Sequence, residues 1–134
     1  MFIVSHDRYL LPLGVLLLAM LPVFHDAHAG QWTPIRDEVT FQCDNAVAQS
    51  GSSVYVVGNH PNPGNWDPTK AIKLNNAGST WTGKVLFPGA DDSKDVEWKC
   101  IVRDDTDSTK APTLQGGANN VVKLAFTAKS VGTF

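Results

Sequence analysis

The stretch Val96–Arg103, VEWKCIVR, shows most clearly what this chain folds into. Its residues alternate, so that Val96, Trp98, Cys100 and Val102 fall on one side of an extended strand. Lys99 lies between Trp98 and Cys100 and points to the opposite side. This pattern predicts a β-strand with one face against a core.

Other short runs of the same kind stand on both sides of that stretch. They cover residues 39–43, 53–57, 71–74, 80–87 and 121–127. Clusters of Gly, Pro, Asn and Asp separate them, and such clusters form turns. No segment keeps apolar residues at positions i, i+3, i+4 and i+7 over ten residues, so no helix is predicted. The chain is therefore expected to be all-β, as a sandwich or a barrel.

Composition limits the size and the partners of the protein. A length of 134 residues is typical of one domain. Lys and Arg number 11 against 13 Asp and Glu, which gives a net charge of -2. Such a balance offers no basic surplus for nucleic acid and no polybasic patch for a membrane surface. The two cysteines also exclude a four-cysteine zinc site.

Residues 1–29 have the organisation of a secretory signal peptide. A polar start containing Arg8 precedes the apolar run 9–23, and the small residues Ala27 and Ala29 follow at the spacing of a cleavage site. The alternative is a membrane anchor, but a run of about fifteen residues is short for a span of about twenty. We therefore expect cleavage after Ala29.

Cleavage would leave residues 30–134 as one secreted or periplasmic domain. His60 would then be its only histidine, which excludes a metal site with two histidines. We expect no metal and no cofactor.

Cys43 and Cys100 are predicted to point into the core, because Cys43 shares its strand face with Val39 and Phe41. An exported compartment favours oxidation of two such thiols to a disulfide. The alternative is two buried thiols that pack as small apolar residues.

The segment Gly58–Pro68, GNHPNPGNWDP, is the most unusual of the chain. Its prolines and glycines fix a loop, and the loop carries Trp66. An aromatic side chain on a rigid loop either offers a flat face to a ligand such as a sugar ring or plugs the edge of the core. The residues of this loop leave both alternatives open.

A larger set of short motifs resembles the starch-binding domain, carbohydrate-binding module family 20. The motifs cover residues 39–41, 54–58, 64–68, 71–74, 81–85, 97–103 and 115–120. The chain looks most similar to the C-terminal modules of bacterial maltooligosaccharide-forming amylases. The resemblance implies an antiparallel, immunoglobulin-like β-sandwich that binds α-1,4-glucan. The ligands would be starch, glycogen, maltooligosaccharides and cyclodextrin.

The resemblance also implies which residues bind the sugar. Trp66 would stack on a glucose ring, while Lys99 and Asn119 would bind its hydroxyl groups. The position of the family's second stacking Trp is occupied by Leu114, followed by Gln115, and both are expected in the site. Leu114 has no ring, so weaker binding is expected.

A second sugar site of the family is expected to be absent or very weak. It relies on tyrosines at two places, and here these read Gln49-Ser50 and Ala77-Gly78-Ser79. Trp81 and Trp98 are predicted to belong to the core rather than to a sugar site.

His60 is expected either in the glucan groove or in an exposed turn. Residues 104–107 are expected at a solvated hairpin tip rather than in a calcium loop.

Three functions are compatible with these residues. The first is a non-catalytic glucan-binding module, acting alone, beside a separately secreted amylase, or as a fragment of an amylase. The second is a structural or protein-interaction domain that kept the fold and lost sugar binding. The third is a small glycoside hydrolase, but the acidic residues cluster in loops, where solvation explains them, and no catalytic residue is expected.

Overall fold

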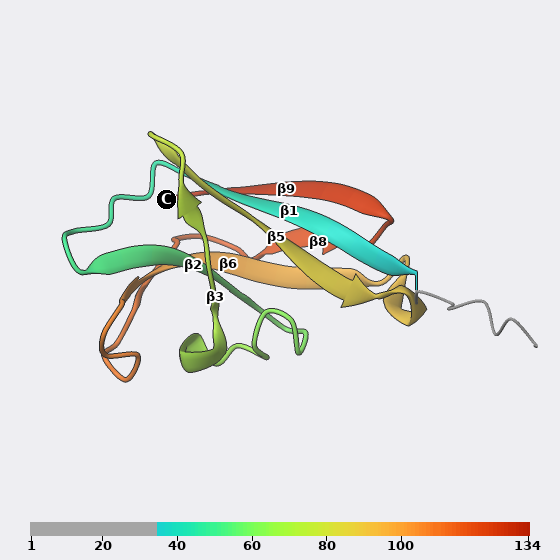
Figure 1. Ribbon diagram of the computed structural model, residues 1–134, viewed down its shortest axis with the longest axis horizontal. Coiled ribbons are helices and arrows are strands. Elements are labelled where there is room, and N and C mark those ends of the chain that lie inside the picture. The colour runs from blue at the N-terminus through green and yellow to red at the C-terminus, as the bar shows by residue number, and fades with distance from the viewer. Residues whose placement is uncertain (1–34) are drawn as a thin grey trace, which may run out of the picture. The chain divides into compact units, whose positions relative to one another are not determined.

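The computed structural model describes residues 35–134, and these form two β-sheets packed face to face (Figure 1). The signal peptide expected at residues 1–29 and the first residues of the expected mature chain lie outside the described residues. Within the described part, no helix has the length and apolar character needed to cross a membrane.

The first sheet, called here the β1 sheet, contains four strands. In spatial order they are β4 (Asn75–Asn76), β5 (Thr80–Pro88), β1 (Arg36–Asp44) and β9 (Thr127–Thr133). The pairing of β1 with β5 is antiparallel, whereas β1 and β9 run parallel.

The second sheet, called here the β6 sheet, contains five strands. They are β3 (Ile72–Lys73), β2 (Ser52–Gly58), β6 (Asp95–Asp104) and β7 (Thr113–Leu114), and β8 (Asn120–Lys123) also pairs with β6. Two short 3-10 helices, η1 (Pro68–Lys70) and η2 (Gly89–Asp91), lie in the connections. All pairs within this sheet are antiparallel.

The core lies between the sheets and follows the predicted alternation. Trp98 is fully buried and packs edge-on against Phe41, with ring centroids 4.8 Å apart. Its indole N–H donates to Ser130 Oγ at 3.0 Å. Trp81 is also buried, and its indole N–H donates to the Ala46 carbonyl. The predicted core positions of both tryptophans are confirmed.

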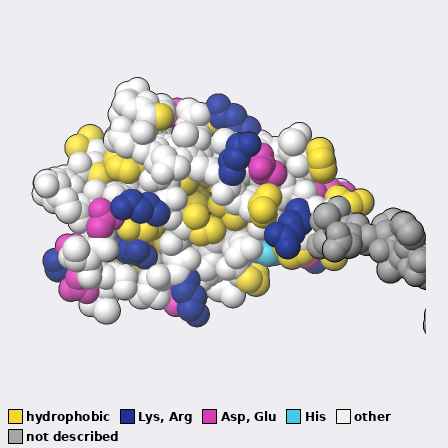
Figure 2. Space-filling model, in the orientation of Figure 1, with side chains coloured by type: hydrophobic (Ala, Val, Ile, Leu, Met, Phe, Trp, Pro, Cys, Tyr) yellow, Lys and Arg dark blue, Asp and Glu magenta, His cyan; other side chains and the backbone are white. Residues whose placement is uncertain are grey.

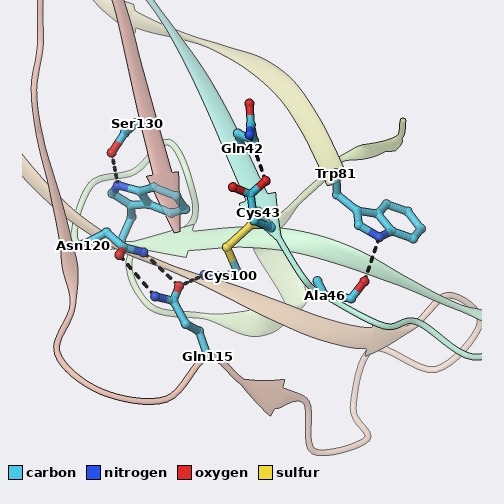
Figure 3. Close-up of a disulfide and its surroundings, with 10 residues drawn as sticks. Gln42, Cys43, Ala46, Trp81, Cys100, Gln115, Asn120 and Ser130 are labelled. Carbon is cyan, nitrogen blue, oxygen red and sulfur yellow. Dashed lines mark hydrogen bonds between the residues drawn. A yellow bond between two sulfur atoms is a disulfide. The ribbon is translucent and has the colours of Figure 1, made fainter. Parts of the chain in front are cut away.

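Cys43 of β1 and Cys100 of β6 form a disulfide across the sandwich, with their Cα atoms 6.0 Å apart. The predicted bridge is confirmed (Figure 3). Gly132 of β9 packs directly against it, since a Cβ atom there would lie 3.0 Å from Cys100 Sγ and 2.7 Å from Gln115 Oε1. Only a residue without a side chain fits at this position.

Two parts of the predicted strand pattern differ from the structure. The run expected at 121–127 ends as β8 at Lys123, and the chain then crosses to the β1 sheet, where Glu38 N donates to the Phe126 carbonyl. The following strand β9 was not predicted, because its inward positions are the small residues Ala128, Ser130 and Gly132 rather than large apolar ones.

The run expected at 71–74 is a strand only at β3, and the turn expected after it begins with a second short strand, β4. β3 pairs with β2, while β4 pairs with β5. Leu74 stands between them, fully buried, so the chain passes from one sheet to the other at this residue.

Candidate functional site

Most of the predicted site residues lie on the outward face of the β6 sheet. Lys99 has the parity of Ile101 along β6, opposite to the inward Trp98 and Cys100. Leu114 pairs with Ile101, and directly opposed residues of an antiparallel pair point to the same side. Leu114 is therefore on the same face as Lys99, with 55% of its surface exposed.

Lys99 is half-buried and holds the loop that follows β7. Its Nζ donates to the carbonyl of Gln115 at 3.0 Å and to that of Gly117 at 2.6 Å. An ammonium group carries three N–H donors, so one remains for a ligand. The side chain thus joins β6 to the 115–119 loop and keeps a positive group at the surface.

Asn119 lies at the far end of the same loop and is exposed. Its Nδ2 donates to Glu97 Oε2 at 2.8 Å. Glu97 shares the outward face with Lys99 two residues along β6. The bond uses one amide N–H of Asn119, so the other N–H can donate to one hydroxyl and the amide oxygen can accept from a second.

Gln115 differs from its neighbours in orientation, because its side chain is buried with only 7% exposed. Its Oε1 accepts from Cys100 N at 3.1 Å and from Asn120 Nδ2 at 2.9 Å (Figure 3). Its Nε2 donates to Asn120 Oδ1. The amide therefore fixes the 115–119 loop from inside, and only the backbone carbonyl of Gln115 faces Lys99.

Trp66 reaches the site from the loop after β2. Its N–H donates to the Gly58 carbonyl at 2.7 Å, which returns the loop to the end of β2. Asn59 ties the same loop to β6 through two hydrogen bonds of 3.0 Å, one to the Glu97 carbonyl and one from the Glu97 N–H. Trp66 is 38% exposed, so the ring is not enclosed by its neighbours.

The backbone of this loop is strained at the tryptophan. Asn65 and Trp66 have φ angles of 52° and 61°, in the left-handed region that bulky residues rarely adopt. Gly64 has a φ of 93°, and a Cβ there would lie 2.9 Å from the Lys70 carbonyl oxygen. Strain of this kind persists where surrounding contacts impose it, and it is common at ligand sites.

The carboxyl group of Asp67, in this loop, does not have the raised pKa of a general acid. Asp67 accepts from the N–H and the hydroxyl of Thr69, and these bonds lower its pKa. A general acid needs the opposite shift. Burial, followed by the charges of Asp92 and Asp91, raises the pKa of Asp37, but Asp37 has the inward parity of Val39 and is remote from this face.

His60 is half-buried rather than in an exposed turn, and its contact was not predicted from the sequence. Its Nε2 lies 3.0 Å from Asp91 Oδ2, which belongs to η2 between β5 and β6. The two residues are 31 positions apart, so no local sequence signal joins them.

The acidic segment 104–107 is closed by its own hydrogen bonds. Asp104 Oδ1 accepts from the N–H groups of Thr106 and Asp107, and Oδ2 pairs with Lys110 Nζ at 2.6 Å. These contacts, with Lys110 first, lower the pKa of Asp104. Within residues 35–134, no group of three or more His, Cys, Asp or Glu side chains is arranged to hold a metal ion.

A hollow of 340 Å³ lies beside Trp81, next to the turn 77–79, where the sequence lacks the tyrosine expected of the family's second sugar site. Its other lining residues are Asn45, Ala46, Val47, Ala48, Asn76, Gly78 and Ser79. None of these is aromatic, and Trp81 is itself buried. The hollow offers no stacking face comparable to Trp66.

Charges of both signs are distributed over the surface. Figure 2 shows Lys and Arg side chains scattered among Asp and Glu, with apolar atoms between them, on the face turned to the viewer. The side of the molecule in view has no basic patch of the kind that a phosphate backbone requires.

Comparison with known proteins places this arrangement in a family. A family model described as a starch binding domain matches residues 37–133. Glucan 1,4-alpha-maltotetraohydrolase of Roseateles saccharophilus is 44% identical over 98 residues, which are 72% of this chain and 17% of that protein. The enzyme of the same name from Stutzerimonas stutzeri is 40% identical over 96 residues, 70% of this chain and 17% of the relative. The chain thus spans about a sixth of the length of these curated relatives.

A solved structure agrees with the sequence matches. The family 20 carbohydrate-binding module of a maltotetraose-forming amylase from Pseudomonas saccharophila STB07 superposes with a TM-score of 0.67 at 42% identity. The match covers 72% of this chain and 99% of that module. With the family model, the relatives and the β-sandwich in agreement, the chain belongs to the starch-binding domain family, carbohydrate-binding module family 20.

Proposed function

We propose that this domain binds starch- and glycogen-type α-1,4-glucans without catalysing a reaction, at one site on the outward face of the β6 sheet. Trp66 stacks on a glucose ring, and Lys99 and Asn119 bind its hydroxyl groups. The observation that carries the proposal is that Trp66 is exposed and held in a left-handed backbone conformation, on a loop that Asn59 ties to β6 at Glu97, the residue that also binds Asn119.

In the proposed site, different side chains contact different parts of the sugar. The flat indole suits the C–H face of a pyranose, and the single remaining N–H of Lys99 suits a hydroxyl oxygen. Gln115 acts from inside the loop, since its side-chain amide binds Cys100 and Asn120 rather than the ligand. Leu114 adds apolar surface at the other flank.

The proposed function includes export of the domain from the cytoplasm. The signal peptide 1–29 would be removed after Ala29, and the domain 30–134 would meet polysaccharide outside the cytoplasm, in the medium or the periplasm. A separately secreted amylase that uses the bound glucan would be a fitting partner. Maltooligosaccharides and cyclodextrins, which present the same glucose faces, would be ligands as well.

A titration of the expected mature domain with β-cyclodextrin or maltoheptaose, followed by tryptophan fluorescence, tests this function. We expect a saturable change, because a sugar on Trp66 removes water from an exposed indole. A folded protein with no change at any sugar concentration would instead favour a structural or protein-interaction domain that has lost sugar binding. Leu114, with no ring to stack, is the residue that favours this second candidate.

Replacing Leu114 by tryptophan is expected to tighten binding about two- to tenfold. A second aromatic face is worth about 0.5–1.5 kcal/mol beyond the area it covers, which corresponds to about a two- to tenfold change in affinity. The measurement is the dissociation constant for β-cyclodextrin. The matched control is Val131→Trp, at an exposed position in the other sheet, where affinity should not change. Equal affinities of wild type and Leu114→Trp would contradict the role given to this position.

A further inference from the structure

His60 connects the loop of Trp66 to the opposite sheet. The loop, residues 59–67, follows β2 of the β6 sheet, whereas η2 follows β5 of the β1 sheet. His60 Nε2 lies 3.0 Å from Asp91 Oδ2, with the two side chains only 16% and 18% exposed. The imidazole also packs edge-on against Phe87 of β5, with centroids 5.0 Å apart.

The second ring nitrogen is held as well. His60 Nδ1 lies 3.1 Å from the N–H nitrogen and 3.0 Å from the carbonyl oxygen of Asn62. A neutral ring that accepts from the Asn62 N–H carries its proton on Nε2 and donates it to Asp91. A protonated ring donates to both oxygens. The contact with Asp91 is thus available in both charge states of the histidine.

Asp91 is a persistent acceptor for this contact. Hydrogen bonds from Lys94 and then from His60 lower the pKa of Asp91. Asp37 carries a like charge close to Asp91, while Lys94 pairs with Asp91. Because the folded-state pKa of Asp91 is depressed, the contact is present at neutral pH and is lost only as the pH falls through that folded value.

The position of His60 is transmitted to Trp66 through the backbone. The His60 carbonyl accepts from Asn65 N at 2.9 Å, and Asn65 is the first of the two left-handed residues. Asn62 adds a second attachment to the β1 sheet, since its Nδ2 donates to the Leu86 carbonyl at 3.1 Å. The strained pair Asn65 and Trp66 is therefore supported from η2 and β5 as well as from β6.

We infer that His60, through Asp91, is a positioning residue for glucan binding: it braces the loop on the opposite sheet and holds Trp66 ready to stack. The expected effect of His60 on glucan affinity rests on the proposed function. The expected effect of His60 on the loop does not depend on any ligand. His60 itself contacts no sugar in this scheme.

The test combines amide hydrogen exchange with binding to β-cyclodextrin. His60→Ala should speed exchange at Asn65 and Trp66 while the β1 and β6 amides keep their protection, and should weaken binding about three- to tenfold. His60→Gln should restore most of the protection from exchange and most of the affinity for β-cyclodextrin. Glutamine carries an N–H donor at a similar reach. Asp92→Asn is the matched control, since Asp92 bonds to Ser93 and not to His60, and should behave as wild type.

The exchange rate at Trp66 decides whether His60 positions the loop. Unchanged exchange at Trp66 in His60→Ala overturns it, whether or not the protein binds glucan. Faster exchange at Trp66 in a protein that binds no sugar supports the brace and refutes the proposed function. If His60→Ala does not fold, Asp91→Asn replaces it in the test. This change weakens the same contact with little change of side-chain shape. An exchange rate at Trp66 equal to that of the wild type in Asp91→Asn would also overturn the inference.

Discussion

The Trp66→Ala domain is expected to pass through a glycogen-containing native gel without retardation, whereas the wild-type domain is slowed. Truncating a central aromatic residue of a binding site typically costs about 2–4 kcal/mol, or about 30- to 1,000-fold in affinity. Trp66 is the exposed aromatic residue of the 59–67 loop, and its ring is the stacking face of the proposed site. Its removal should therefore have the largest effect on binding of any single substitution.

The controls for this experiment separate binding from folding. Alanine and tryptophan are both strained at a φ of 61°, so thermal unfolding of Trp66→Ala should remain close to that of the wild type. Phe126→Ala removes another aromatic side chain, 71% exposed and in the turn before β9, and should leave retardation unchanged. Identical migration of wild type and Trp66→Ala in gels with and without glycogen would show that the site is misplaced.

Removal of the disulfide should produce the largest loss of stability. Cys43 and Cys100 are 57 positions apart, and closing a loop of this length stabilises a protein by about 4 kcal/mol in the chain-entropy model, with about 2–4 kcal/mol typical of measured cases. In a domain of this size, such a loss lowers the midpoint of thermal unfolding by roughly 10–20 °C. The measurement is thermal unfolding of wild type and of the double variant Cys43→Ala/Cys100→Ala.

A reductant provides the internal control. Dithiothreitol should lower the midpoint of the wild type and leave the double variant unchanged, because the sequence contains no other cysteine. Wild-type and double-variant midpoints within about 3 °C of one another would contradict a stabilising role for the bridge.

Much of the fold was predictable because strong alternation marks the central strands. Val96, Trp98 and Cys100 identified both β6 and its inward face. The same parity directed Cys43 and Cys100 into the core, and the bridge was favoured over two free thiols because an exported compartment is oxidising. β9 has no such signal. Its inward Gly132 has no room for a side chain, because a Cβ there would lie 2.6 Å from Asn120 Nδ2, 2.7 Å from Gln115 Oε1 and 3.0 Å from Cys100 Sγ, and these contacts exist only after the sheets have met.

The site was predictable to a similar extent. The outward direction of Lys99 followed from its place between Trp98 and Cys100, and the exposure of Trp66 agrees with the prediction of a surface ring. The inward direction of Gln115 follows from its place directly after the outward Leu114, but the two-residue strand β7 was too short to be predicted. The contact of His60 with Asp91 depends on two connections from different sheets, which only the three-dimensional fold brings together.

The parallel pairing of β1 and β9 has a practical consequence for attaching this domain to a solid support. Phe134 N donates to the Asp44 carbonyl, so the last described residue lies at the end of β1 that is remote from Arg36. Asn62 of the Trp66 loop binds Leu86, which pairs with Glu38 near the start of β1. A nine-residue strand spans about 25–30 Å. A linker joined to Phe134 would therefore hold the domain on a sensor chip with the Trp66 loop turned toward the solution.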